Sequence, residues 1–151
     1  MNMDIVNAIN SSDQMISKIC PAYFVEKFIC DFNGNKFVLD NSTKDILSSF
    51  DKKIVVLAGR RTGKTTAAIL YSIWKCLFHK CDVILLVRDT YKNINKIKAI
   101  LTASGIDFVL KGRYFYFNGY VLSIENINFF GRGYGKHYDL YVYDEYIDYE
   151  L

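Results

Sequence analysis

Residues 55–70 have the sequence VVLAGRRTGKTTAAIL, and the prediction of the fold starts from this stretch. It opens in a β-branched run typical of a strand buried on both faces of a parallel sheet. It ends in an apolar segment typical of a buried helix. Between the two, Ala58 and Gly63-Lys64-Thr65 match the pattern of a small residue, any four residues, and Gly-Lys-Ser/Thr. The stretch therefore predicts a strand, a phosphate-binding loop and a helix, in that order.

The residue types of the loop follow from what phosphate binding needs. Backbone N–H groups must wrap closely around a β-phosphate, and a side chain at Gly63 would obstruct them. We expect Lys64 to reach the β and γ oxygens and Thr65 to join the shell of Mg²⁺, with Thr66 as the weaker hydroxyl candidate. The predicted cofactors are ATP and Mg²⁺, and the predicted binding residues are Ala58, Gly59, Arg60, Arg61, Thr62, Gly63, Lys64, Thr65 and Thr66.

A second motif, DLYVYDE at 139–145, is an apolar strand that ends in two acids. Asp144 is a candidate magnesium ligand, and Glu145 is a candidate base that polarises the attacking water. Neighbouring residues of a strand point to opposite sides, so the pair can act together only at the end of the strand. The alternative is that both acids are solvated charges at the end of an edge strand.

Two arginines in the loop exceed what a phosphate cradle needs. One of them, Arg60 or Arg61, could cover the γ-phosphate as an internal arginine finger. Surface charge or a contact with DNA is the alternative for each.

Strands and helices alternate from residue 53 onward, which predicts an α/β fold with a largely parallel sheet. Residues 1–48 are predicted to form an N-terminal helical segment and residues 49–151 a partial ATPase core. Asn118-Gly119 is a hairpin turn signal. The expected helices are 3–18, one from Pro21, 41–50, 65–78 and 90–105, and the expected strands are 36–40, 53–59, 82–89, 106–110, 114–118, 120–125 and 139–145.

The amino-acid composition limits the classes of protein to which this chain can belong. The chain has 151 residues, 51% of them hydrophobic and 23% charged, which is typical of a globular protein. The net charge of +3 permits a nucleic acid partner without arguing for one. The cysteine spacings match no common zinc pattern. The chain also has no run of about 18 apolar residues, the length that could span a membrane. We expect reduced thiols, a cytoplasmic location and no membrane partner.

With these motifs in view, residues 20–151 resemble the ATPase part of the large terminase subunit, the motor that packages DNA into viral capsids. The resemblance rests on PAYFVEKF, AGRRTGKTT, FNGYVLSI and GRGYGKHYDLYVYDE. It implies a P-loop NTPase of the RecA-like class, with a three-layer α/β/α core that is incomplete here. It also implies ATP hydrolysis coupled to translocation of double-stranded DNA in the host cytoplasm, together with other terminase or portal subunits. By resemblance, Lys64, Thr65, Asp144 and Glu145 take the roles given above, and Arg60 lies near the γ-phosphate.

Two departures from that family stand out. Thr43 occupies the position where family members often have an adenine-reading glutamine. The chain also ends at Leu151, before the family's coupling strand and nuclease domain. In the related topology that strand lies between the phosphate-loop strand and the Asp-Glu strand, so its absence predicts a gap in the sheet. Another chain fills the gap, the sheet closes differently, or the sequence is a fragment.

Two other functions stay open. One is a helicase-like, nucleic-acid-dependent ATPase, in which basic side chains line the path of a nucleic-acid strand. The alternative is that these basic side chains form a solvated helix face. The other is a nucleotide-binding or assembly module that hydrolyses little, in which Tyr114, Phe115 and Tyr116 either stack bases or form hairpin core. The candidate basic residues are Lys92, Lys96, Lys98, Lys111 and Arg113.

Overall fold

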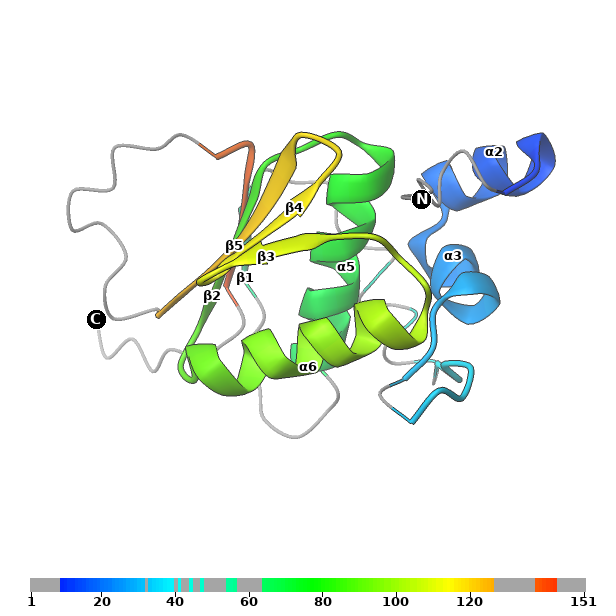
Figure 1. Ribbon diagram of the computed structural model, residues 1–151. Coiled ribbons are helices and arrows are strands. Elements are labelled where there is room, and N and C mark those ends of the chain that lie inside the picture. Colours follow the sequence, from blue (N-terminus) through cyan, green and yellow to red (C-terminus); the bar gives the residue numbers. More distant parts are fainter. Residues whose placement is uncertain are drawn as a thin grey trace.

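The computed structural model describes residues 9–31, 33–39, 41, 44, 47, 54–56, 64–126 and 138–143. For 54–56, Lys64, Thr65 and Tyr143 the description covers the backbone alone. The described strands form a six-stranded mixed sheet in the order β1-β6-β2-β5-β4-β3, with helices packed beside it (Figure 1). The predicted α/β class is therefore confirmed. The predicted phosphate-binding loop falls on residues 57–63, which lie outside the described residues.

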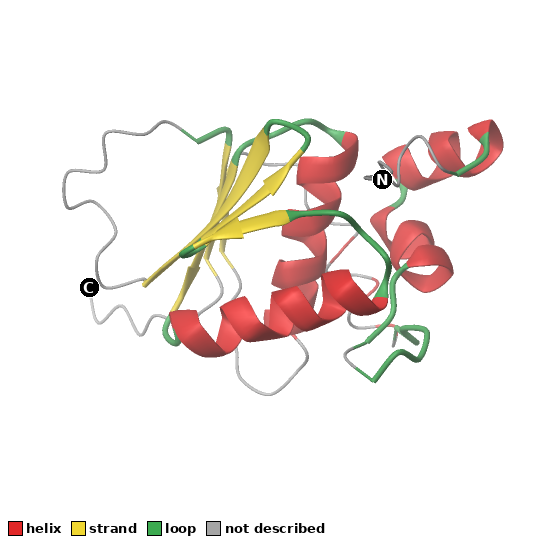
Figure 2. Ribbon diagram, in the orientation of Figure 1, coloured by secondary structure: helices red, strands yellow, loops and turns green. Residues whose placement is uncertain are grey.

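Four neighbouring strands form the parallel half of the sheet: β1 (Ile54–Val56), β6 (Leu140–Tyr143), β2 (Val83–Val87) and β5 (Tyr120–Asn126). Helix α5 (Lys64–Phe78) links β1 to β2, and α6 (Thr90–Ala103) follows β2. Both crossovers run in the same direction across the sheet, and right-handed crossovers then place both helices on one face. Figure 2 shows α5 and α6 together on that face.

The other half of the sheet is antiparallel. Strands β3 (Val109–Lys111) and β4 (Tyr114–Phe117) pair with each other, and β4 pairs with β5. The β4–β5 turn has positive φ angles at Asn118 (51°) and Gly119 (94°). This is the backbone of a two-residue type I′ hairpin turn, which Asn-Gly favours. The predicted turn is confirmed.

The core lies between the sheet and helices α5 and α6. Alternate residues of β2 face different sides, so Leu85 joins the helix-side cluster while Ile84 and Leu86 join a smaller cluster on the opposite face. All five residues of β2 are buried, as its continuous apolar run predicts. On the helices, residues 67–74 of α5 are all buried, and Ile97 and Leu101 anchor α6.

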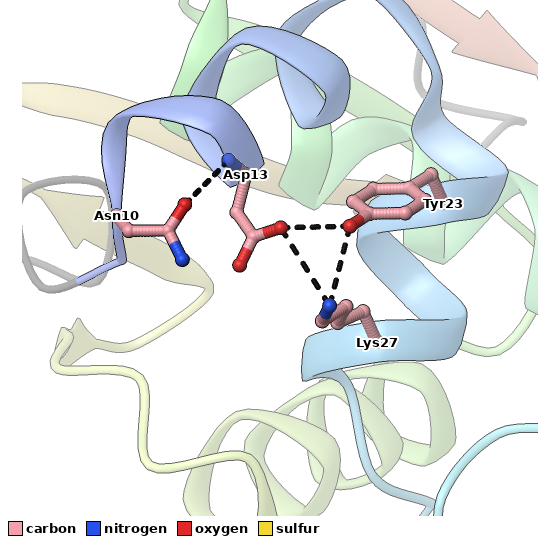
Figure 3. Close-up of polar contacts among 4 residues, drawn as sticks. All are labelled: Asn10, Asp13, Tyr23 and Lys27. Carbon is pink, nitrogen blue, oxygen red and sulfur yellow. Dashed lines mark hydrogen bonds and ion pairs between the residues drawn. The ribbon is translucent and has the colours of Figure 1, made fainter.

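Helices α2 (Ser11–Ile19) and α3 (Pro21–Phe28) precede the sheet. The helix expected at 3–18 begins only at Ser11 in the described residues, because the chain at Asn10 is extended and caps the helix, and positions 3–8 lie outside the described residues. The helix expected from Pro21 ends at Phe28. Asn10 caps α2 by accepting a hydrogen bond from the N–H of Asp13 (2.8 Å). The Asp13 carboxylate accepts a hydrogen bond from the hydroxyl of Tyr23 (2.7 Å), and Lys27 donates to the same hydroxyl (Figure 3). The hydrogen bond to Tyr23 and the charge of Asp13 raise the pKa of Lys27. This network ties α2 to α3.

The N-terminal helices pack directly on α5. The indole N–H of Trp74 donates to the carbonyl of Ser17 (2.6 Å), and His79 Nε2 lies 2.9 Å from the carbonyl of Lys18. A carbonyl oxygen only accepts, so this nitrogen carries the proton. Phe24 of α3 packs edge-on against Phe78, with ring centroids 4.8 Å apart.

The strands expected at 36–40 and 106–110 differ from the structure, and the second begins only at Val109, as β3. Residues Phe37 to Leu39 are not a strand, because the only pairing around them in the described part is a bridge between Cys30 and Lys36. In the helix expected at 41–50, Asn41, Lys44 and Leu47 are helical, and the other positions lie outside the described residues.

The predicted gap in the sheet does not exist, because β1 and β6 pair directly. Val55 is the register partner of Val142, and Val56 that of Tyr143. The RecA-like order, with a strand between these two, is therefore wrong for the described sheet. No opening remains between them for a strand from another chain to fill. Separately, no described helix has both the length and the apolar character needed to cross a membrane.

We expect His79 to make stability fall at mildly acidic pH. Burial, with the nearby charges of Lys75 and Lys18, lowers its pKa below the ordinary 6.5. The unfolded chain therefore takes up the proton first, so the stabilisation is complete above 6.5 and is lost as the pH falls through the window below it. His79→Gln should lose less unfolding free energy than the wild type between pH ~7.5 and ~5.5 in urea titrations. Equal losses would contradict this assignment.

Candidate functional site

The candidate site lies at the edge of the sheet where the four parallel strands end. One row of register partners runs across this edge: Val56, Tyr143, Leu86 and Glu125. Adjacent strands lie about 4.8 Å apart. In open α/β sheets, ligands bind at the carboxyl ends of the strands. The two strands that precede the predicted motifs therefore end side by side at the edge where a ligand is expected.

The predicted site residues divide into two groups. Positions 58–63 of the loop, with both arginines, and the Asp144-Glu145 pair lie outside the described residues. Lys64 and Thr65 open helix α5, and their backbone is described. Thr66 is described in full and is half-buried. The structure thus locates the strands and the helix that flank the loop.

Helix α5 begins at the carboxyl edge. β1 runs toward this edge, and α5 must return to the opposite edge, where β2 begins at Val83. The first-turn N–H groups of an α-helix have no partner within the helix, and its N-terminus carries a partial positive charge. A helix of 15 residues that starts at Lys64 therefore presents a site for an anion at this edge.

Lys96 approaches the same turn from helix α6. Its ammonium donates a hydrogen bond to Thr66 Oγ1 at 3.0 Å. Lys92 and Lys98 are exposed, which agrees with the alternative of a solvated helix face, whereas Lys96 is half-buried and does not belong to that face. Its position was detectable in the sequence: 93, 96, 97 and 100 follow the i, i+3, i+4, i+7 spacing of a buried face.

Polar residues also lie at this carboxyl edge of the sheet, at or just after the ends of β2 and β5. Asp89 caps α6 by accepting from the N–H of Lys92 (2.9 Å), and Asn126 Nδ2 donates to the carbonyl of Arg88 (2.9 Å). Glu125 is 2% exposed and forms an ion pair with Arg113 Nε at 2.6 Å. Neither Glu125 nor Asn126 belongs to a recognisable sequence motif, so nothing in the sequence marks them as candidates.

The aromatic cluster of β4 divides between the two faces of the sheet. Phe115 is fully buried in the core, so the hairpin-core interpretation is confirmed for it. Tyr114 and Tyr116 lie on the opposite face with Tyr138 and Tyr141. The Arg113 guanidinium lies 5.8 Å from the ring centre of Tyr114, and the Lys111 ammonium lies 5.9 Å from that of Tyr116.

The cysteines and the other potential ligands give no metal site in the described part of the chain. Cys20, Cys30, Cys76 and Cys81 are free thiols. Burial raises the pKa of Cys76 well above its usual range, which keeps this thiol protonated. Among the residues described, no three His, Cys, Asp or Glu side chains converge as metal ligands need to.

Comparisons with protein-family models, with curated proteins and with solved structures gave no match to this chain.

The direct pairing of β1 and β6 can be tested by nuclear magnetic resonance. We expect cross-strand NOEs between the backbone protons of Val55 and those of Val142, because paired strands lie about 4.8 Å apart and an intervening strand would double that distance. The β2–β5 pair Val83 and Leu122 provides the positive control in the same spectrum. NOEs from Val55 to some other segment, with none to 141–143, would refute this order of strands.

Proposed function

We propose that this chain binds a nucleoside triphosphate with Mg²⁺ through a P-loop that connects β1 to α5. The observation that carries the proposal is the register of Val56 with Tyr143. The Gly-Lys-Thr motif follows the first of these strands, and the Asp-Glu pair follows the second. Because the two strands end together, the segments after them leave the sheet as neighbours. A phosphate cradle and a metal-binding carboxylate must be neighbours in such a site.

Each residue has a defined task in this proposal. The backbone N–H groups at 59–65 surround the β-phosphate, and Lys64 contributes a positive charge to the β and γ oxygens. Thr65 and Asp144 would hold Mg²⁺, which neutralises the charge that develops on these oxygens. Glu145 orients and deprotonates the attacking water, and Arg60 reaches the γ-phosphate.

We further propose that the reaction is ATP hydrolysis, and that the chain works as a terminase-type ATPase module on double-stranded DNA with other packaging subunits. The double-arginine loop and the terminal strand ending in Asp-Glu support this class. The direct β1–β6 pairing is the point at which the described sheet differs from the related core. A helicase-like ATPase would use the exposed Lys92 and Lys98 on α6 as its nucleic-acid contacts.

The β1–β6 pairing favours a second candidate, a module that binds ATP and hydrolyses little. A coupling strand that senses the γ-phosphate has no position between these two strands in the described sheet. Tight binding without turnover is the expected behaviour of a nucleotide-dependent assembly module.

Lys64→Ala should abolish Mg-ATP binding, because removing the lysine takes away the main charge on the β and γ oxygens. Isothermal titration calorimetry measures the affinity, and the exposed Lys92→Ala provides a control that removes one positive charge elsewhere. Unchanged binding by the Lys64 variant would refute the phosphate-loop assignment.

Glu145→Gln should keep ATP affinity and lower turnover by about 10²-fold or more, the range for loss of a general base. Phosphate release, measured with and without double-stranded DNA, checks this. Wild-type turnover that DNA stimulates supports the motor. ATP binding with negligible turnover in both conditions supports the assembly module, and equal turnover in the variant and the wild type would refute the role of Glu145.

A further inference from the structure

We infer that Lys96 is a second phosphate-binding lysine of this site, which reaches it from helix α6. The inference rests on the proposed nucleotide site and adds a residue that lies outside the motif, 32 positions after Lys64. The observation that carries it is the hydrogen bond from Lys96 Nζ to Thr66 Oγ1 at 3.0 Å.

The bond brings the Lys96 ammonium to the first turn of α5. Thr66 is the third residue of that helix, so its own N–H belongs to the group of four that lack a helical partner. An ammonium has three N–H donors and can contact more than one acceptor at a time. A phosphate oxygen that accepts from the first-turn N–H groups would lie within reach of the same ammonium.

The packing of α6 holds Lys96 in this place. The next residue, Ile97, is fully buried, and so are Ile100 and Leu101 one turn further along. These anchors fix the rotation of α6 about its axis and turn position 96 toward α5. Figure 1 shows α6 crossing the end of α5 at which that helix begins, in agreement with the hydrogen bond.

The charges around this contact support a phosphate-binding role for Lys96. A helix N-terminus carries about half a positive charge, so it stabilises anions and destabilises cations. The Lys96 ammonium nevertheless lies against the first turn of α5. A phosphate at this turn would be attracted both by the helix N-terminus and by this ammonium.

The two lysines belong to different positions of the first turn: Lys64 is the motif lysine, and Lys96 donates to Thr66, two residues further along. The motif lysine is assigned the β and γ oxygens, so we assign Lys96 to a phosphate other than the γ-phosphate. We therefore expect it to contribute equally to binding of ATP and of ADP, whereas loss of a γ-phosphate contact would affect ATP alone.

The test compares the wild type with Lys96→Met, Lys96→Arg and Lys98→Met in the full chain. Methionine keeps the apolar stem and removes the charge, arginine keeps the charge, and Lys98 is an exposed lysine of the same helix. Calorimetry with Mg-ATP and with Mg-ADP gives the affinities. Circular dichroism and thermal unfolding establish that each variant is folded.

We expect Lys96→Met to lower the affinity for both nucleotides by about tenfold or more, the usual effect of losing a charge-assisted hydrogen bond. Lys96→Arg should restore most of the affinity, and Lys98→Met should bind like the wild type. A purely structural role would lower the unfolding temperature of Lys96→Met and leave both affinities unchanged, which would overturn the inference.

The outcomes separate this inference from the proposed function. If the wild type binds and Lys64→Ala does not, while Lys96→Met binds normally, the nucleotide site stands and the role of Lys96 is refuted. If Lys96→Met weakens the binding of ATP and not that of ADP, the assignment of Lys96 to a phosphate other than the γ-phosphate is refuted. If the wild type binds neither nucleotide, both the site and the role of Lys96 are refuted.

Discussion

The parallel pairing of β1 with β6 is the constraint on which the candidate site depends. Val56 and Tyr143 are far apart in the sequence but are direct register partners. The strands that precede Gly-Lys-Thr and Asp-Glu in the sequence therefore end at neighbouring positions of the sheet. Because strand spacing is about 4.8 Å, a single intervening strand would separate these two ends by another such step. The distance between the two strand ends is thus set by strand order.

The rest of the architecture supports that edge. Central strand β2 is buried along its whole length and pairs with β6 on one side and β5 on the other. Helix α5 is buried from Ala67 to Trp74, so it cannot shift without opening the core. Its other end is tied to the N-terminal helices through Trp74 and His79. Because α5 is buried along its middle and tied at its C-terminal end, its N-terminus stays at the carboxyl edge of the sheet.

The Lys96 ammonium lies at the start of α5, on one side of this edge. Helix α5 begins there with Lys64, and Lys96 reaches its first turn from α6. The buried carboxylate in the same row, Glu125, is paired with Arg113. An anion at the start of α5 would therefore meet cations and unpaired N–H groups, while the acid at the end of β5 is already neutralised by its partner.

The sequence by itself determined the local elements, because local chemistry decides them. The β-branched run of β2, the apolar periodicity of α6 and the Asn118-Gly119 turn each specify a backbone conformation within a few residues. Only the tertiary structure decided that β6 lies between β1 and β2, because pairing between distant strands leaves no periodic trace in the chain. It also decided that Lys96 points to Thr66 and that Glu125 is buried. Those positions depend on how α6 is rotated against its neighbours and on which face of β5 is covered, and packing between elements settles both.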